Sequence, residues 1–215
     1  QLAFSDLGSD RDGVVGGYYE ERTAGFSTLD YQVSDDETLY GVYVRSAPEE
    51  GLGYAIYADV FESDAGTEKQ EIGAELSGDI TPALSYEIGV EFLDEVTATT
   101  NGDRLIAAGR LSYAISEETT VYGFAQQTVE NNGLEAYDRY GLGGTRDIES
   151  GLAVTGELSD GTGGLGGRVL VERRDSTNSS TYFGYELDPG RAIDAGISTA
   201  DNGGKYVLGG RRQIS

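Results

Sequence analysis

The chain contains no cysteine, histidine, methionine or tryptophan among its 215 residues. Without cysteine it forms no disulfide and offers no thiolate as a metal ligand or nucleophile. Without histidine it lacks the commonest metal ligand and the usual general base. We therefore predict that the protein is not an enzyme and that it uses no cofactor and no metal ion.

Positive charge is also scarce. Lys69 and Lys205 are the only lysines, and the formal net charge is -23. A nucleic-acid surface needs clustered basic residues that neutralise phosphates, so we expect no nucleic-acid partner. The sequence has no run of about 18 apolar residues, and we therefore expect no transmembrane helix.

What the sequence does contain is an alternation of apolar and polar residues. In residues 84–92 the even positions are all apolar and the odd positions are polar or small. A period of two predicts a β-strand with two different faces. Similar segments recur along the chain, separated by breaks rich in Gly, Pro, Asn and Asp. We count roughly 12 to 14 strands of about ten residues each, in a single domain over residues 1–215.

Residues 31–42 and 113–124 resemble each other closely, each with a short acidic turn followed by Tyr-Gly. Equivalent turns in an up-and-down sheet should lie an even number of strands apart, yet five predicted strands separate these two. We therefore expect one false break or one missing strand. Residues 68–76 are compatible with helix or strand, and we favour strand because their neighbours are strands.

Two architectures can produce the alternation. A soluble sandwich or solenoid packs its apolar face on a core, whereas a membrane barrel turns it toward lipid and its polar face toward the lumen. The segments are long enough to cross the hydrocarbon layer when tilted. Charges of both signs occur in mid-strand, and we predict that they line a lumen: Glu71, Glu75, Glu87, Glu91, Arg110, Glu157, Arg168 and Glu172.

Tyrosines recur near the predicted strand ends, where the amphipathic ring suits a membrane interface. The predicted interfacial aromatics are Tyr31, Tyr40, Tyr86, Tyr113 and Tyr122. Together with the long segments and the charged mid-strand positions, they favour the membrane barrel over a secreted or surface-exposed β-sandwich or β-solenoid used in adhesion or structure.

The acidic, Gly- and Tyr-rich hairpin at residues 114–124 resembles those of large Gram-negative outer-membrane β-barrels, porin-like or surface-anchoring. The resemblance is one of pattern over nearly the whole chain. It implies an antiparallel, up-and-down transmembrane barrel that acts as a passive pore or as the anchor of a larger surface assembly. The expected partners are outer-membrane lipid or lipopolysaccharide and other protein chains of a surface complex.

One feature departs from that family. Such barrels usually end in an aromatic residue, whereas this chain ends Arg-Arg-Gln-Ile-Ser. We therefore expect either a segment of a larger barrel or an incompletely covered chain.

Three further motifs receive modest interpretations. Glu87 and Glu91 share one strand face and could act as an acid and base pair, but we favour a lumen wall. Residues 161–166 match G-x-G-x-x-G, yet a strand and not a helix is expected to follow, so we predict a loop. The acidic turns at residues 10–13 and 34–37 are read as solvated turns in preference to weak calcium sites.

The excess of acidic residues predicts that a pore formed by this chain has a weak preference for cations.

Overall fold

The computed structural model describes residues 2–5, 12–25, 33–46, 51–148, 151–174, 179–187 and 204–211. These residues form thirteen β-strands: β1 (Leu2–Ser5), β2 (Asp12–Arg22), β3 (Glu37–Ser46), β4 (Gly53–Ser63), β5 (Thr67–Thr81), β6 (Leu84–Val96), β7 (Asn101–Ser116), β8 (Thr119–Asn132), β9 (Arg139–Ile148), β10 (Leu152–Gly161), β11 (Gly166–Arg174), β12 (Ser180–Leu187) and β13 (Gly204–Arg211).

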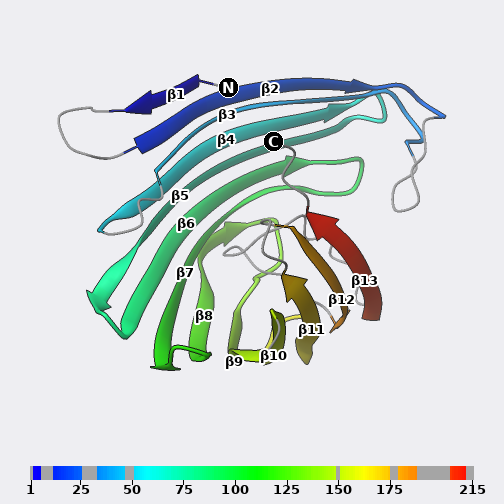
Figure 1. The fold of residues 1–215 in the computed structure, drawn as a ribbon. Helices are drawn as coiled ribbons and strands as arrows, with labels where there is room; N and C mark the ends of the chain where they lie inside the picture. The colour runs from blue at the N-terminus through cyan, green and yellow to red at the C-terminus, as the bar shows by residue number, and fades with distance from the viewer. Residues whose placement is uncertain are drawn as a thin grey trace. The chain divides into compact units, whose positions relative to one another are not determined.

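The strands form a single sheet in which each strand lies next to its neighbours in the sequence (Figure 1). The ladders from β1 to β5 and from β8 to β13 are antiparallel. The predicted all-β, antiparallel, up-and-down fold of 12 to 14 strands is therefore confirmed. A sandwich needs two sheets and a solenoid needs parallel coils, and the described residues contain neither.

The chain divides into two compact units. The first unit comprises Gln1–Gly78, Glu87–Ala107 and Thr128–Ala136, and the second comprises Asp79–Tyr86, Ala108–Gln127 and Tyr137–Ser215. Each unit consists of β-strands, and the long strands β5 to β8 contribute residues to both units. The single domain expected from the sequence stays a prediction.

Several predicted strands and breaks can be compared directly with the structure. Residues 68–76 lie within β5, so the preference for strand over helix is confirmed. The break expected at residues 78–82 is displaced: β5 continues to Thr81, and the turn falls at Pro82 and Ala83. The Thr81 hydroxyl accepts hydrogen bonds from the backbone N–H groups of Ala83 and Leu84, at 3.3 and 3.1 Å, and these bonds hold the turn.

The two similar sequence segments are not equivalent in structure. Residues 113–124 form a tight hairpin between β7 and β8. In the other segment, β2 has already ended at Arg22, Val33 accepts a backbone hydrogen bond from Gly25, and residues 31 and 32 lie outside the described residues. Strands β3 to β7 separate the two turns, so the assigned breaks are real and the even-number expectation is wrong. Acidic turn residues satisfy local turn geometry at either end of a strand.

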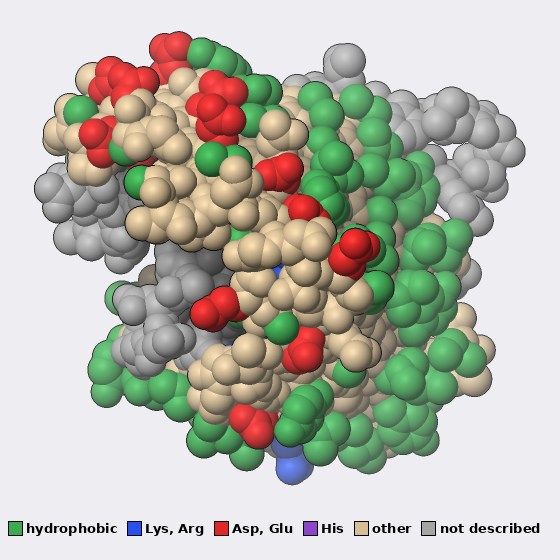
Figure 2. All heavy atoms as spheres, turned by 180° about the vertical axis from the view of Figure 1, so that it is seen from behind, with side chains coloured by type: hydrophobic (Ala, Val, Ile, Leu, Met, Phe, Trp, Pro, Cys, Tyr) green, Lys and Arg blue, Asp and Glu red, His purple; other side chains and the backbone are tan. Residues whose placement is uncertain are grey.

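The burial pattern is unusual for a protein folded in water. Among the described residues, the buried hydrophobic side chains are Val33, Ile106, Tyr122 and Ala153. Large apolar side chains instead lie exposed in the middle of strands, where Leu142 is 72% and Leu158 is 70% exposed. Figure 2 shows extensive areas of hydrophobic side chains on the surface. Within the described part of the chain, no helix is long and apolar enough to cross a membrane.

Candidate functional site

The polar face of the sheet, opposite the exposed apolar face, gathers the charged side chains. In the first unit the β-ladders align Tyr18, Gly41, Asp59 and Glu71 directly opposite one another on β2 to β5. Four residues further along β3 to β5, a second row on the same face aligns Arg45, Ala55 and Glu75. Because side chains on one face recur every second residue, the carboxylates of β4 and β5 are neighbours on this face.

Tyrosine hydroxyls contact the carboxylates of this face. The Tyr18 hydroxyl donates to Asp59 Oδ1 at 2.7 Å. The Tyr57 hydroxyl donates to Glu91 Oε2 at 3.5 Å, and this contact is partly buried. Each bond joins side chains from strands that are two places apart in the sheet. The carboxylates are consequently held against the sheet.

In the second unit, one row crosses four strands and contains a buried ion pair. Tyr122 on β8 is opposite Gly143, Gly143 is opposite Glu157, and Glu157 is opposite Arg168. The Tyr122 hydroxyl donates to Glu157 Oε2 at 2.6 Å, and Arg168 Nε lies 4.0 Å from the same oxygen. The Glu157 side chain is 0% exposed. A buried carboxylate needs such partners because its desolvation is costly.

Arg110 on β7 completes this cluster. Its guanidinium carbon lies 4.0 Å from the centroid of the Tyr122 ring, which is a close cation–π contact. Arg110 and Tyr122 also line a small pocket with Phe124 and Gln126. The buried tyrosine therefore contacts a carboxylate through its hydroxyl and a guanidinium through its ring.

Two other buried polar side chains of the second unit have clear partners. Arg139 Nη1 donates to the Ser159 hydroxyl at 2.8 Å, and Gln126 Nε2 donates to the Tyr137 carbonyl at 2.8 Å. The sequence identifies Arg139 as a possible partner of a lumen glutamate, whereas its partner in the structure is Ser159, and sequence reasoning does not single out Ser159, Gln126 or Tyr137. Gln126 lies at a polar-face position of its strand, so the alternation could have identified it.

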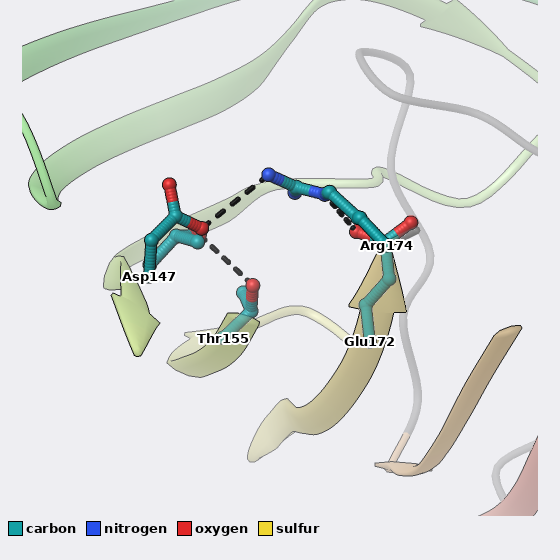
Figure 3. A network of polar contacts seen from close by, with 5 residues as sticks. Asp147, Thr155, Glu172 and Arg174 are labelled. Atoms are coloured by element: carbon teal, nitrogen blue, oxygen red, sulfur yellow. Dashed lines mark hydrogen bonds and ion pairs between the residues drawn. The ribbon is translucent and has the colours of Figure 1, made fainter. Parts of the chain in front are cut away.

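A more exposed network lies at the C-terminal ends of β9 and β11. Arg174 Nη1 lies 3.3 Å from Asp147 Oδ1, and Arg174 Nε lies 2.8 Å from Glu172 Oε2. Figure 3 shows the Arg174 side chain reaching between the two carboxylates. Close by, the hydroxyls of Thr145 and Thr155 are 2.9 Å apart. The small Ala153 lies between Asp147 and Glu172 in the register, which leaves room for the arginine.

The predicted lumen-lining residues occupy different environments. Glu157 is buried, and the others are half-buried on their strands: Glu71, Glu75, Glu87, Glu91, Arg110, Arg168 and Glu172. Acidic residues predominate among those of the first unit, and both signs occur among those of the second. That they line a lumen stays a prediction.

The predicted interfacial tyrosines differ in how exposed their side chains are. Tyr113 is 52% exposed, Tyr40 is exposed and donates to Glu62 at 3.3 Å, and Tyr86 is half-buried. Tyr31 lies outside the described residues. Tyr122 departs from the expectation, because its side chain is only 5% exposed and bonds to Glu157. Its neighbours Val121 and Gly123 occupy the apolar face, so strand parity places Tyr122 on the polar one.

The remaining motifs gain no support as catalytic or binding sites. Glu87 and Glu91 are four residues apart on β6, or about 13 Å along a strand, which exceeds the carboxyl separation of glycosidases. Gly166 begins the strand β11, so the glycine motif is followed by a strand as expected. Within the described ranges no group of three or more His, Cys, Asp or Glu residues could hold a metal ion.

No family model matches the chain, and no curated protein matches it either. Among solved structures, the chain is similar to one described as "KdgM porin", with 13% sequence identity and a TM-score of 0.43. The similarity covers 81% of this chain and 89% of that chain.

Proposed function

We propose that the chain forms a β-barrel in the bacterial outer membrane and acts as a passive pore that prefers cations. The observation that carries this proposal is the contrast between the two faces of the same strands. Leu142 and Leu158 are exposed and directly opposite each other on β9 and β10, while Glu157, the residue before Leu158, is buried. Such an inverted pattern is typical of barrels in lipid.

The energetics favour lipid as the environment of the apolar face. Leaving a large apolar side chain in water forgoes about 1.5–3 kcal/mol of burial free energy. The exposed residues continue across neighbouring strands, as with Val169, Tyr185 and Tyr206 on β11 to β13. A continuous surface of this kind in water would cause association, whereas acyl chains would cover it.

The proposal also requires a closed sheet. In the hydrocarbon layer no water is present to satisfy an open strand edge, so only closed barrels and helices cross a membrane.

The strands must also be long enough to span the hydrocarbon layer. The strands β2 to β11 contain between 9 and 16 residues, and about 9–11 residues suffice for a tilted crossing.

Cation preference follows from the charge of the polar face. The whole chain carries a formal net charge of -23, and Asp59 and Glu71 are directly opposite each other on the polar face of the first unit. A wall of one charge sign raises the local concentration of counter-ions. Outer-membrane lipid or lipopolysaccharide would contact the apolar face.

The experiment is purification in detergent followed by electrophoresis and planar-bilayer recording. We expect heat-modifiable migration, stable conductance, and a reversal potential of cation-selective sign in a KCl gradient. A protein that stays monomeric and folded without detergent would contradict the membrane assignment. Anion selectivity would contradict the cation preference alone.

A role as the anchor of a larger surface assembly is the second candidate. The strands β7 and β8 contain 16 and 14 residues, more than a bilayer crossing needs. Polar contacts support their far ends: Asn132 Nδ2 donates to Asp103 Oδ2 at 3.0 Å, and Arg104 Nη1 donates to the Glu135 carbonyl at 3.1 Å. An anchor predicts heat-modifiable, detergent-dependent protein that shows no conductance and is recovered with other protein chains.

A further inference from the structure

Two arginines of the second unit lie on the apolar face of the sheet, among exposed hydrophobic side chains. Arg146 on β9 is four residues from Leu142, and Arg173 on β11 is four residues from Val169, so each shares the face of its exposed apolar neighbour. Both arginines are exposed. Within the part of the chain that the structure describes, neither guanidinium forms a hydrogen bond or an ion pair.

Strand pairing brings the two arginines to adjacent rows of this face. Arg146 is directly opposite Val154 on β10, and Val154 is directly opposite Val171 on β11. Arg173 follows Val171 by two residues and therefore points to the same side. Two strand spacings and an offset of two residues separate the arginine backbones by about 12 Å. Two side chains as long as arginine can approach one phosphate group from either side across this separation.

The acidic residues next to these arginines in the sequence lie on the other face. Asp147 follows Arg146 and Glu172 precedes Arg173, so strand parity places both carboxylates on the polar face. There Arg174 contacts both of them, at 3.3 and 2.8 Å (Figure 3). The residues directly opposite the two arginines on the apolar face are uncharged: Thr119, Leu152, Val154 and Thr181. The two positive charges are therefore available to a ligand outside the protein.

The position of the arginines along their strands suits a membrane interface. Strand β9 ends at Ile148, two residues after Arg146, and β11 ends at Arg174, one residue after Arg173. The cost of a cation on a lipid-facing surface is greatest at the middle of the bilayer and falls toward the interface. There the aliphatic stem stays among acyl chains while the guanidinium reaches the headgroups. A guanidinium binds phosphate through two parallel hydrogen bonds.

The strand connections of the second unit indicate which leaflet the arginines border. At their end of the strands the connections comprise residues 117–118, 149–151 and 175–179, and at the other end residues 133–138, 162–165 and 188–203. Outer-membrane barrels have short turns on the periplasmic side and longer loops outside. The apolar face also changes charge sign along its length, because the other end of β10 carries Asp160, directly opposite Tyr140.

We propose that Arg146 and Arg173 form a binding site for the phosphate group of an anionic glycerophospholipid in the periplasmic leaflet. The proposal rests on the proposed function, because only a membrane-spanning sheet places this face against lipid. Glycerophospholipid is the lipid of that leaflet, whereas lipopolysaccharide forms the outer one. The two guanidinium groups bind the phosphate, and Val154 and Val171 between them contact the acyl chains.

The lipid beside the arginine pair can be identified with one introduced tryptophan, since the chain contains none. V171W places an indole next to both arginines, at a side chain that is 39% exposed. The full chain is reconstituted in phosphatidylcholine vesicles that contain a minor fraction of brominated phosphatidylglycerol or brominated phosphatidylcholine. Bromine quenches the indole only in contact. We expect stronger quenching by phosphatidylglycerol, and a smaller difference at high salt because salt screens the attraction.

Substitution of the arginines tests the site itself. One arginine near an anionic membrane surface is worth about fivefold in affinity, so R173Q in the V171W chain should lower the preference for phosphatidylglycerol by about fivefold. R146Q/R173Q should abolish the preference. The matched control is R174Q, which removes the same charge one residue away on the polar face and should keep the preference. A preference that persists in R146Q/R173Q, or that is lost equally in R174Q, would overturn the proposal.

Heat-modifiable migration verifies that each variant is folded. If R146Q/R173Q does not fold, the single variants R146Q and R173Q carry the test, and an unchanged preference in both overturns the proposal.

The leaflet is tested in intact Gram-negative cells with a large, impermeant maleimide. The chain has no cysteine, so E117C at the end of the arginine pair and E135C at the other end each give one labelling site. We expect E135C to be labelled and E117C to be protected until the cells are broken. Labelling of E117C alone in intact cells would place the arginines in the lipopolysaccharide leaflet and contradict the assignment to glycerophospholipid.

The failure of this inference is distinguishable from failure of the proposed function. An indole in V171W that neither brominated lipid quenches would show that this face does not contact lipid, which contradicts the membrane assignment. Equal quenching by the two brominated lipids would leave that assignment intact and contradict only the phosphate site.

Discussion

The hydroxyl of Tyr122 on β8 donates a 2.6 Å hydrogen bond to Glu157 on β10, across the intervening strand β9. The bond is possible because Gly143, directly between the two residues, has no Cβ atom. Arg168 and Arg110 complete the surroundings of this pair. This cluster therefore buries part of the polar face of the second unit.

Removal of the Tyr122 hydroxyl should destabilise the protein. Tyr122→Phe takes a donor from a buried carboxylate, which typically costs about 1–3 kcal/mol. Reversible unfolding by urea from lipid vesicles measures the loss. Tyr113→Phe is the matched control because Tyr113 is exposed, and it should change the free energy of unfolding by less than about 0.5 kcal/mol. Equal effects of the two substitutions would show that the Glu157 bond contributes nothing.

A methyl group at Gly143 should be poorly tolerated. The Cβ atom would lie 2.4 Å from Cζ of Tyr122, so Gly143→Ala must displace the ring, and overpacking of this kind costs about 1–3 kcal/mol. Gly156 on β10 is the control, since a Cβ atom there meets nothing within 4 Å. We expect Gly156→Ala to be neutral or stabilising in the same unfolding experiment. Destabilisation by Gly156→Ala alone would be the opposite of this expectation.

A charge on the apolar face should be costly only in a membrane. Leu142→Arg places a guanidinium among exposed apolar side chains, and in the middle of a bilayer this costs about 2–4 kcal/mol. In water the same substitution at an exposed position would have little effect. The folding efficiency into lipid vesicles measures the difference, with Glu117→Arg at the β7–β8 turn as control. Normal folding of Leu142→Arg would argue that this face contacts water.

The two arginine networks should differ in their contribution to stability. Arg174 is half exposed, and exposed ion pairs are worth about 0–1 kcal/mol, so Arg174→Gln should have little effect on unfolding. Arg168→Gln removes a guanidinium from beside the buried Glu157, and breaking a buried pair typically costs about 3–5 kcal/mol. A comparison of the two variants under identical conditions tests this ranking, which the reverse order would refute.

Local sequence pattern predicted the strands well because strand parity is a property of adjacent residues. The alternation at residues 84–92 corresponds to β6, and the ambiguous residues 68–76 belong to β5. The acidic turn at Glu117 and Glu118 lies where expected. The similar segment at residues 31–42 did not form an equivalent hairpin, because turn composition does not specify how long the flanking strands are.

The candidate site was harder to predict because it depends on register. The sequence identified Glu157 and Arg168 as polar-face residues, but not that they are opposite each other or that Tyr122 reaches Glu157. The position of Tyr122 near a turn predicts an interfacial site, whereas its strand parity places it on the polar face. The sequence does not show which glycines lie beneath aromatic rings, since only the pairing of strands determines which aromatic residue covers each one.

The most direct test of the membrane assignment is spin labelling along β6 in lipid vesicles. The chain has no cysteine, so a single introduced cysteine carries the label without ambiguity. Labels at Ile88, Val90 and Phe92 should be relaxed mainly by lipid-soluble oxygen, and labels at Glu87, Gly89 and Glu91 mainly by a water-soluble nickel complex. This alternation, with a period of two, would place the apolar face in lipid and the polar face in water. Equal access of the nickel complex to all six positions would contradict the account.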